Sequence, residues 1–90
     1  MPSASRPRRP SRRVPMLPEV AFGLVLCQLR LERGLTQADL EGDDIMERSY
    51  ISRVESGRTQ ICLRGILHLA EKLQLTPAEL MAAVSEKMHR

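Results

Sequence analysis

The sequence of 90 residues is poor in aromatic side chains, with no Trp, one Tyr and one Phe. Its core must therefore be built from Leu, Ile, Val, Ala and Met. The sequence also lacks the alternating runs of β-branched residues and the Asn-Gly pairs that mark strands and hairpins. These absences predict an all-α fold, and the length leaves room for one compact domain.

Patterns typical of enzymes are absent as well. The sequence has no Gly-rich phosphate loop, no metal-ligand cluster, and no Ser or Cys with a neighbouring base. We therefore expect no catalytic residue, no cofactor and no metal. Cys27 and Cys62 lie far apart without metal-ligand spacing, and we expect both to be small apolar packing residues in a reducing compartment. No apolar run approaches the roughly 20 residues of a membrane span, so we expect no membrane partner.

The net charge of +3 is unevenly distributed. Residues 1–18 contain five Arg and no acidic residue, a charge of +5. The rest of the chain holds the other nine Lys or Arg and all eleven Asp or Glu, a charge of −2. Five prolines also fall in residues 1–18, and proline opposes helix formation. We predict a disordered basic arm over 1–17 and a folded domain over 18–90. The arm could follow DNA phosphates or enter a minor groove; it could also be a solubilising tail, or precede a start at Met16.

Helical patterns run through the rest of the chain. A first helix is expected from Pro18 or Glu19 to Arg33, a later one over 63–74, and a last one from Pro77. Thr76 supplies the N-cap of that last helix, with Pro77 at N1 and Glu79 at N3. The expected core residues of the first two of these helices are Phe22, Val25, Leu26, Leu29, Leu63, Ile66, Leu69, Ala70 and Leu73. The last helix carries an apolar strip that is either the last wall of the core or a dimer surface, formed by Leu80, Met81, Val84 and Met88. Leu24, Cys27 and Leu31 form a second apolar face on the first helix, which suggests a further contact, internal or with a partner chain. His68 is expected to be exposed and without a role.

The stretch 34–57 is predicted to contain two short helices joined by a turn, a helix-turn-helix over about 36–56. Thr36 is a good N-cap with Asp39 at the capping-box position, which predicts a short helix over 37–41 around Leu40. Gly57 suits a left-handed C-terminal cap for the next helix. In that helix Ile51 and Val54 share one face. Arg48, Ser49, Ser52 and Arg53 fall on the other, which is how a DNA-reading helix must be built.

Four segments together resemble the lambda-repressor/Cro-like helix-turn-helix family, also called the XRE family. They are LRLERGLTQADL (29–40), RSYISRVESG (48–57), LHLAEKLQL (67–75) and TPAEL (76–80), and the resemblance covers about 22–80. It implies a compact five-helix lambda-repressor-like domain. It also implies that Arg30 pairs with Glu55, joining the first helix to the end of the recognition helix.

The turn departs from the family pattern. Glu41 stands where the family has a small Ala, Asp44 and Ile45 where it has an apolar residue and a Gly, and Glu47 where it has Ser or Thr. From the residues alone, Gly42 could end the short helix and Asp44 could cap the next one, with Glu47 as its capping-box partner. On this hypothesis the turn lies at Gly42–Asp43 and the recognition helix begins near Ile45.

The resemblance implies a sequence-specific regulator of transcription that binds double-stranded DNA, acting in the cytoplasm in association with the nucleoid. The residues expected to contact DNA are Gln37, Arg48, Ser49, Tyr50, Ser52, Arg53, Arg58 and Thr59, with the Tyr50 hydroxyl free to reach a phosphate. Family members commonly form homodimers through the last helix, so we expect a homodimer there, with the face of Leu24, Cys27 and Leu31 as a second candidate. The alternative function is a protein-interaction module on the same fold, antitoxin-like or anti-activator, which the acidic turn favours.

Overall fold

The computed structural model describes residues 16–44 and 46–89. In chain order its elements are α1 (Pro18–Glu32), a short 3₁₀ helix η2 (Ala38–Leu40), α2 (Arg48–Glu55), α3 (Leu63–Lys72) and α4 (Pro77–Met88). These residues contain no β-strand, which confirms the all-α prediction. The arm predicted over 1–17 lies almost wholly outside the described residues and stays a prediction.

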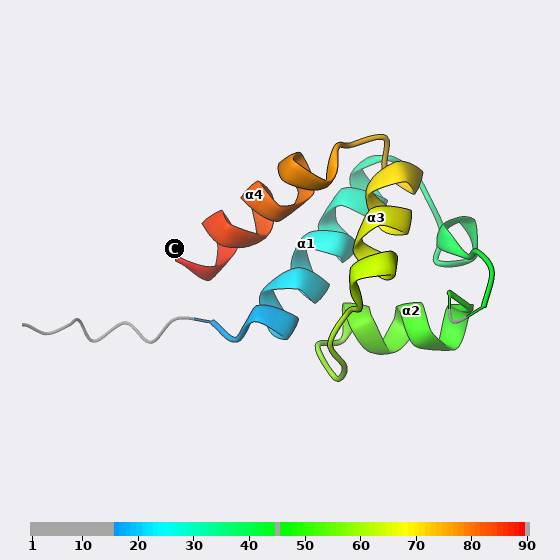
Figure 1. Cartoon of the computed structure of the whole chain (residues 1–90), viewed down its shortest axis with the longest axis horizontal. Coiled ribbons are helices and arrows are strands. Elements are labelled where there is room, and N and C mark those ends of the chain that lie inside the picture. The colour runs from blue at the N-terminus through cyan, green and yellow to red at the C-terminus, as the bar shows by residue number, and fades with distance from the viewer. Residues whose placement is uncertain (1–15, 45, 90) are drawn as a thin grey trace, which may run out of the picture.

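α1 is the central element of the domain (Figure 1). It packs against α4 along its side and against α2. α3 packs against both α4 and η2. The residues that these contacts bury are all apolar. They are Ala21, Phe22, Val25, Leu26, Leu40, Met46, Ile51, Val54, Leu69, Ala70, Leu73, Leu80 and Val84.

The ends of α2 and α4 follow the predicted capping, and the end of α1 has a similar glycine cap. Gly34 and Gly57, with φ of 68° and 77°, adopt the left-handed conformation after α1 and α2 that glycine takes without strain. At the start of α4 the hydroxyl of Thr76 accepts a bond of 3.0 Å from the Glu79 amide, and the Glu79 carboxylate accepts one of 2.8 Å from the Thr76 amide. α3 ends in the same way at Gln74, whose φ is 60° although it is not a glycine.

The prediction of five helices is not confirmed: the described part of the chain has four α-helices and the three-residue 3₁₀ helix η2. Thr36 and Asp39 do form the predicted reciprocal hydrogen bonds, of 3.1 and 2.7 Å. The short helix nevertheless stops at Leu40, because Glu41 turns to extended backbone with ψ of 153°. The chain here forms a single turn of helix instead of the expected segment 37–41.

The predicted start of the recognition helix near Ile45 was wrong. Asp44 has a φ of 57°, a left-handed conformation that cannot cap a helix at this point. The Gly42 amide donates to the Met46 carbonyl at 2.8 Å, so the turn closes on itself and α2 begins only at Arg48. Glu47 is then the N-cap residue rather than a capping-box partner, and its side chain makes no cap bond.

Three further side-chain predictions need correction. His68 is half-buried, and its Nε2 lies 2.8 Å from the Leu40 carbonyl oxygen, so it ties α3 to η2. Leu63, the first residue of α3, was expected in the core but is 71% exposed. Cys62 is exposed and caps α3, with its Sγ accepting from the Gly65 amide at 3.4 Å. Among the described residues, no helix has the length and hydropathy required to span a membrane.

Candidate nucleic-acid interface

α2 has two distinct faces, as its sequence predicts. Ile51 and Val54 are buried, with 0% and 1% of their surface exposed, and they hold the helix against α1. On the opposite side Arg48, Ser49, Ser52 and Arg53 are all exposed. The helix therefore offers two guanidinium groups and two hydroxyls to the surroundings, the donor types that read base edges and bind phosphates.

Tyr50 supports this surface from the side. The guanidinium carbon of Arg53 lies 5.8 Å from the centre of the Tyr50 ring, within range of a cation–π contact. The Tyr50 hydroxyl donates to the Gln60 carbonyl at 3.2 Å and accepts from the Cys62 amide at 3.4 Å. Burial raises the pKa of Tyr50. The prediction of a free hydroxyl was therefore wrong, because both of its bonds go to the loop before α3.

A half-buried ion pair joins α2 to α1. The Arg30 guanidinium donates from Nε to Glu55 Oε2 at 2.6 Å and from Nη2 to Glu55 Oε1 at 3.1 Å. The two side chains are 13% and 8% exposed, and the hydrogen bond to Glu55 raises the pKa of Arg30 above its ordinary value. This confirms the pairing that the family resemblance implied. It also makes Arg30 a structural residue rather than a DNA-reading one.

Gln37 belongs to the same network. Its Nε2 donates to Glu55 Oε1 at 3.1 Å, so one of its two amide hydrogens is used inside the protein. Gln37 and Arg48 nevertheless line one open hollow of about 600 Å³, together with Thr36 and Arg30. The structure thus brings two of the predicted DNA contacts, one beside η2 and one at the start of α2, to a common concave surface.

Arg58 and Thr59 lie at the other end of α2, in the loop after Gly57. Arg58 is exposed and Thr59 is half-buried. α2 has eight residues, and a helix of that length extends about 12 Å. These two residues and the hollow near Arg48 therefore flank the exposed face of α2 at opposite ends. The predicted site residues form a strip along α2, with Gln37 at one end and Arg58 at the other.

The acidic turn adjoins the amino end of this strip. The Glu41 carboxylate accepts from the backbone amide of Arg48 at 3.1 Å, and the Glu47 carboxylate accepts from the Ser49 hydroxyl at 3.4 Å. Asp43 and Asp44 are exposed beside them. Across residues 16–44 and 46–89 the one ion pair is Arg30–Glu55, so no described cation pairs with these carboxylates. The bond from Arg48 to Glu41 had no local sequence signal, because it spans seven residues.

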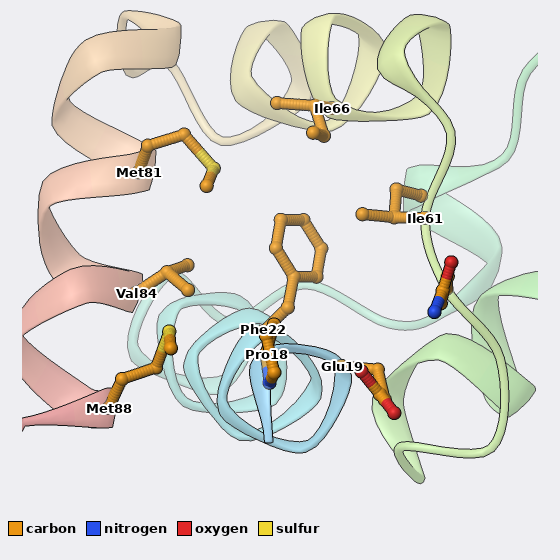
Figure 2. Close-up of a pocket in the computed structure, with 9 residues that line it drawn as sticks. Pro18, Glu19, Phe22, Ile61, Ile66, Met81, Val84 and Met88 are labelled. Carbon is orange, nitrogen blue, oxygen red and sulfur yellow. The ribbon is translucent and has the colours of Figure 1, made fainter. Parts of the chain in front are cut away.

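A second surface is an apolar groove of about 330 Å³ between α1, α3 and α4 (Figure 2). The Phe22 ring rises from α1 into its centre, between Met81, Val84 and Met88 of α4 on one side and Ile61 and Ile66 on the other. Met81, at its edge, is 40% exposed. The groove includes three of the four residues in the apolar strip that the sequence assigned to the last helix.

A short helix, a closed turn and a second helix that displays arginines define a helix-turn-helix domain. The chain belongs to the helix-turn-helix domain family, whose profile matches residues 21–83, and within it to the regulators of XRE type. Residues 21–83 include every residue of the strip along α2.

Solved structures of regulators have the same fold. The restriction-modification controller protein C.AhdI from Aeromonas hydrophila is 40% identical, with a TM-score of 0.63 over 69% of this chain and 94% of that one. The clp gene regulator ClgR from Corynebacterium glutamicum is 22% identical, with a TM-score of 0.75 over 82% and 79% of the two chains. The controller protein C.Esp1396I, solved as a tetramer with its natural 35 base-pair operator, is 20% identical, with a TM-score of 0.72 over 83% and 99%. The last two show the fold alone.

A curated plant protein shares a short segment with this chain. UDP-glycosyltransferase 71D2 of Arabidopsis thaliana is 40% identical over 52 residues, which are 58% of this chain and 11% of that enzyme. The matched segment is too small a share of the enzyme to indicate that this protein has the same activity.

Proposed function

We propose that this protein is a sequence-specific DNA-binding transcriptional regulator without catalytic activity, which binds a two-fold operator as a homodimer. The observation that carries the proposal is the exposed face of α2, where Arg48 and Arg53 point outward from a helix held by buried Ile51 and Val54. C.AhdI, a controller protein, and C.Esp1396I, solved on its operator, support this function for the shared fold. A regulator of this kind acts where the chromosome lies, and we place it in the cytoplasm with the nucleoid.

The roles of the site residues differ along the strip. Arg48 and Arg53 carry paired donors that match the O6 and N7 acceptors of guanine, so we assign them to base reading. Ser49 and Ser52 lie between them and can bond to either bases or phosphates. Arg58 and Thr59, at the end of α2, are assigned to phosphates. Gln37 contacts phosphate through its second amide hydrogen, and Tyr50 acts through Arg53 and the loop before α3.

Gel-shift titration tests the proposal with two probes, DNA from upstream of the gene and a shuffled sequence, at two salt concentrations. Arg48→Ala and Arg53→Ala should each cost about 1–3 kcal/mol on the preferred sequence and relax specificity at one base pair. Lys72→Ala is the matched control, because it removes one exposed positive charge at the end of α3 away from α2 (Figure 1). An equal loss on both probes would assign the arginine to phosphate instead of base. Absence of binding by the unmodified protein would refute the function.

The homodimer is assigned to the groove of Figure 2, because Met81, which is 40% exposed, leaves apolar surface there that a second copy would cover. The face of Leu24, Cys27 and Leu31 is the second candidate, with Leu24 45% and Leu31 61% exposed. Two copies would set their recognition helices against half-sites about one helical turn apart, roughly 34 Å.

Sedimentation at micromolar concentration separates the two faces. Met81→Glu and Leu24→Glu each place one carboxylate in an exposed apolar position, so the two variants are matched. If the groove is the interface, Met81→Glu should produce monomers and Leu24→Glu should leave the dimer intact. The reverse pattern would move the interface to the face of Leu24, Cys27 and Leu31. A purely monomeric wild-type protein would remove the dimer from the proposal.

The arginines of residues 1–17 are assigned to DNA phosphates. Removing residues 1–15 should flatten the dependence of log affinity on log salt by roughly one unit for each phosphate that the arginines neutralise. An unchanged slope would make the segment a solubilising tail.

A second candidate function is a protein-interaction module on the same fold. It is favoured by one specific observation, the carboxylates of Glu41, Asp43, Asp44 and Glu47 beside the amino end of α2, which pair with no cation in the described part of the chain and oppose phosphates. Its partner would be a basic polypeptide surface. DNA binding that is absent, or that disappears entirely with residues 1–15, would favour this second candidate.

A further inference from the structure

The amino end of α2 already holds an anion from within the protein. A helix N-terminus presents free amides and the positive end of the helix dipole, so it attracts phosphates and carboxylates. Here Glu41 Oε2 accepts from the first helical amide, that of Arg48, at 3.1 Å. The N-cap residue Glu47 makes no side-chain cap bond. Glu41 therefore takes the place that an N-cap side chain or a DNA phosphate would take.

The local fold fixes Glu41 in this position. His68 of α3 holds the preceding residue, with Nε2 2.8 Å from the Leu40 carbonyl. The following residue, Gly42, lies so close to the His68 ring that a Cβ there would be 2.8 Å from Nε2. Beyond it, the Gly42 amide closes the turn onto Met46. Next to Glu41, the backbone is thus held by the Leu40–His68 bond on one side and by the Gly42–Met46 bond on the other.

We propose that Glu41 is an intramolecular competitor for DNA phosphate at the interface. The inference rests on the proposed function, in which the N-terminal part of a recognition helix approaches the duplex. A carboxylate in the anion site repels the sugar-phosphate backbone of any sequence. It does not weaken the donors of Arg48 and Arg53, which read bases. Glu41 therefore lowers the affinity for DNA of every sequence, and the base contacts of Arg48 and Arg53 provide a larger share of the affinity that remains.

The test compares Glu41→Gln with Glu71→Gln in the full-length protein. Both changes remove one negative charge from an exposed carboxylate, but Glu71 lies at the end of α3 away from α2 (Figure 1). Glutamine keeps an oxygen acceptor for the Arg48 amide, and circular dichroism with thermal unfolding checks that both variants fold. Affinity for the preferred and the shuffled probe is measured across a series of salt concentrations. Any contribution of residues 1–15 is the same in all three proteins.

We expect Glu41→Gln to bind both the shuffled and the preferred probe about fivefold more tightly at low salt. The slope of log affinity against log salt should steepen by roughly 0.9, the value for one added phosphate contact. Glu71→Gln should change affinity less than about twofold and leave the slope unchanged.

Three results would overturn the inference. Equal gains in the two variants would reduce Glu41 to a contribution to overall charge. A folded Glu41→Gln that binds no better, while the wild-type protein binds its preferred probe, would refute the competitor and leave the proposed function standing. If neither the wild-type protein nor Glu41→Gln binds any probe, the proposed function and the inference both fail.

Discussion

Replacement of Gly23 by alanine tests how closely α1 and α2 must approach. A Cβ at Gly23 would lie 2.5 Å from the Glu55 carbonyl oxygen and in even closer contact with that of Val54. Ordinary van der Waals contact begins near 3.4 Å, so the two helices would have to separate by almost an ångström. The atoms in the way belong to the backbone of α2, which cannot turn aside as a side chain can.

The cost of that separation follows from what the contact buries. Ile51 and Val54 are almost fully buried, and burial of two such side chains contributes roughly 3–6 kcal/mol. A gap approaching about 1 Å forfeits about a quarter to a half of the contact energy, roughly 1–3 kcal/mol. Strain in the Arg30–Glu55 pair adds about 1–2 kcal/mol, and the better helix propensity of alanine returns up to about 1 kcal/mol. These terms give a net loss of about 1–5 kcal/mol, with a central value near 3 kcal/mol that corresponds to a Tm lower by roughly 12–24 °C.

Urea and thermal unfolding followed by circular dichroism measure this loss. Gly65→Ala is the matched control, because Gly65 also lies inside a helix and its added Cβ would meet the Cδ1 of Ile61 at 2.5 Å. That atom is the end of a side chain that can rotate, so the control should change stability by less than about 1 kcal/mol. The predicted loss is refuted if the free energy of unfolding of Gly23→Ala lies within about 0.5 kcal/mol of the wild-type value, or is no lower than that of Gly65→Ala. The close approach of α1 and α2 would then not limit stability.

Three other changes have defined outcomes. Gln74 has a φ of 60°, so Gln74→Gly should raise the free energy of unfolding by roughly 0.5–1 kcal/mol; the urea midpoint measures it, and a lower midpoint would contradict the strain. Glu55→Ala removes the carboxylate that accepts from Arg30 and Gln37. The free energy of unfolding, measured by chemical denaturation, should fall by about 2 kcal/mol. A loss near zero would show that the Arg30–Glu55 pair contributes no more than an exposed ion pair. Hydrogen bonds with the backbone amide and with the side chain of Thr36 hold the pKa of Asp39 below its ordinary value. The stability from Asp39 is therefore present above about pH 4 and lost as pH falls through its folded pKa, so Asp39→Asn should flatten the acid limb of the stability profile.

Local capping patterns were predictable because they act within three or four residues. Thr76 with Glu79, and Thr36 with Asp39, form reciprocal hydrogen bonds from residue types and spacing alone. Gly57 ends α2 for the same reason, because its φ of 77° is open to glycine. The pairing of Arg30 with Glu55 spans 25 residues and was accessible only through the family resemblance.

The turn before α2 could not be predicted, because contacts with other elements determine it. Asp44 and Glu47 have the residue types and spacing of a cap and its partner, and local rules alone favour a helix from Ile45. The structure instead closes Gly42 onto Met46 and packs Gly42 against His68, which belongs to α3 beyond the whole of α2. That packing leaves room for glycine alone. Glu41 then reaches Arg48 across the turn, a bond that no short-range pattern encodes.

The charge distribution sets what the interface can do. The chain after position 18 carries −2, and the exposed strip on α2 holds Arg48 and Arg53 beside the carboxylates of the acidic turn. Non-specific affinity for DNA comes from neutralised phosphates, so this domain has few contacts with which to hold random sequence. A nearby carboxylate would directly repel a DNA phosphate. In the proposed function it would weaken the pairing of the two guanidinium groups with guanine much less. Under the proposed function, the acidic turn weakens general attraction to DNA and makes base contacts a larger share of the affinity, so we expect a second copy to be required for a useful affinity on an operator.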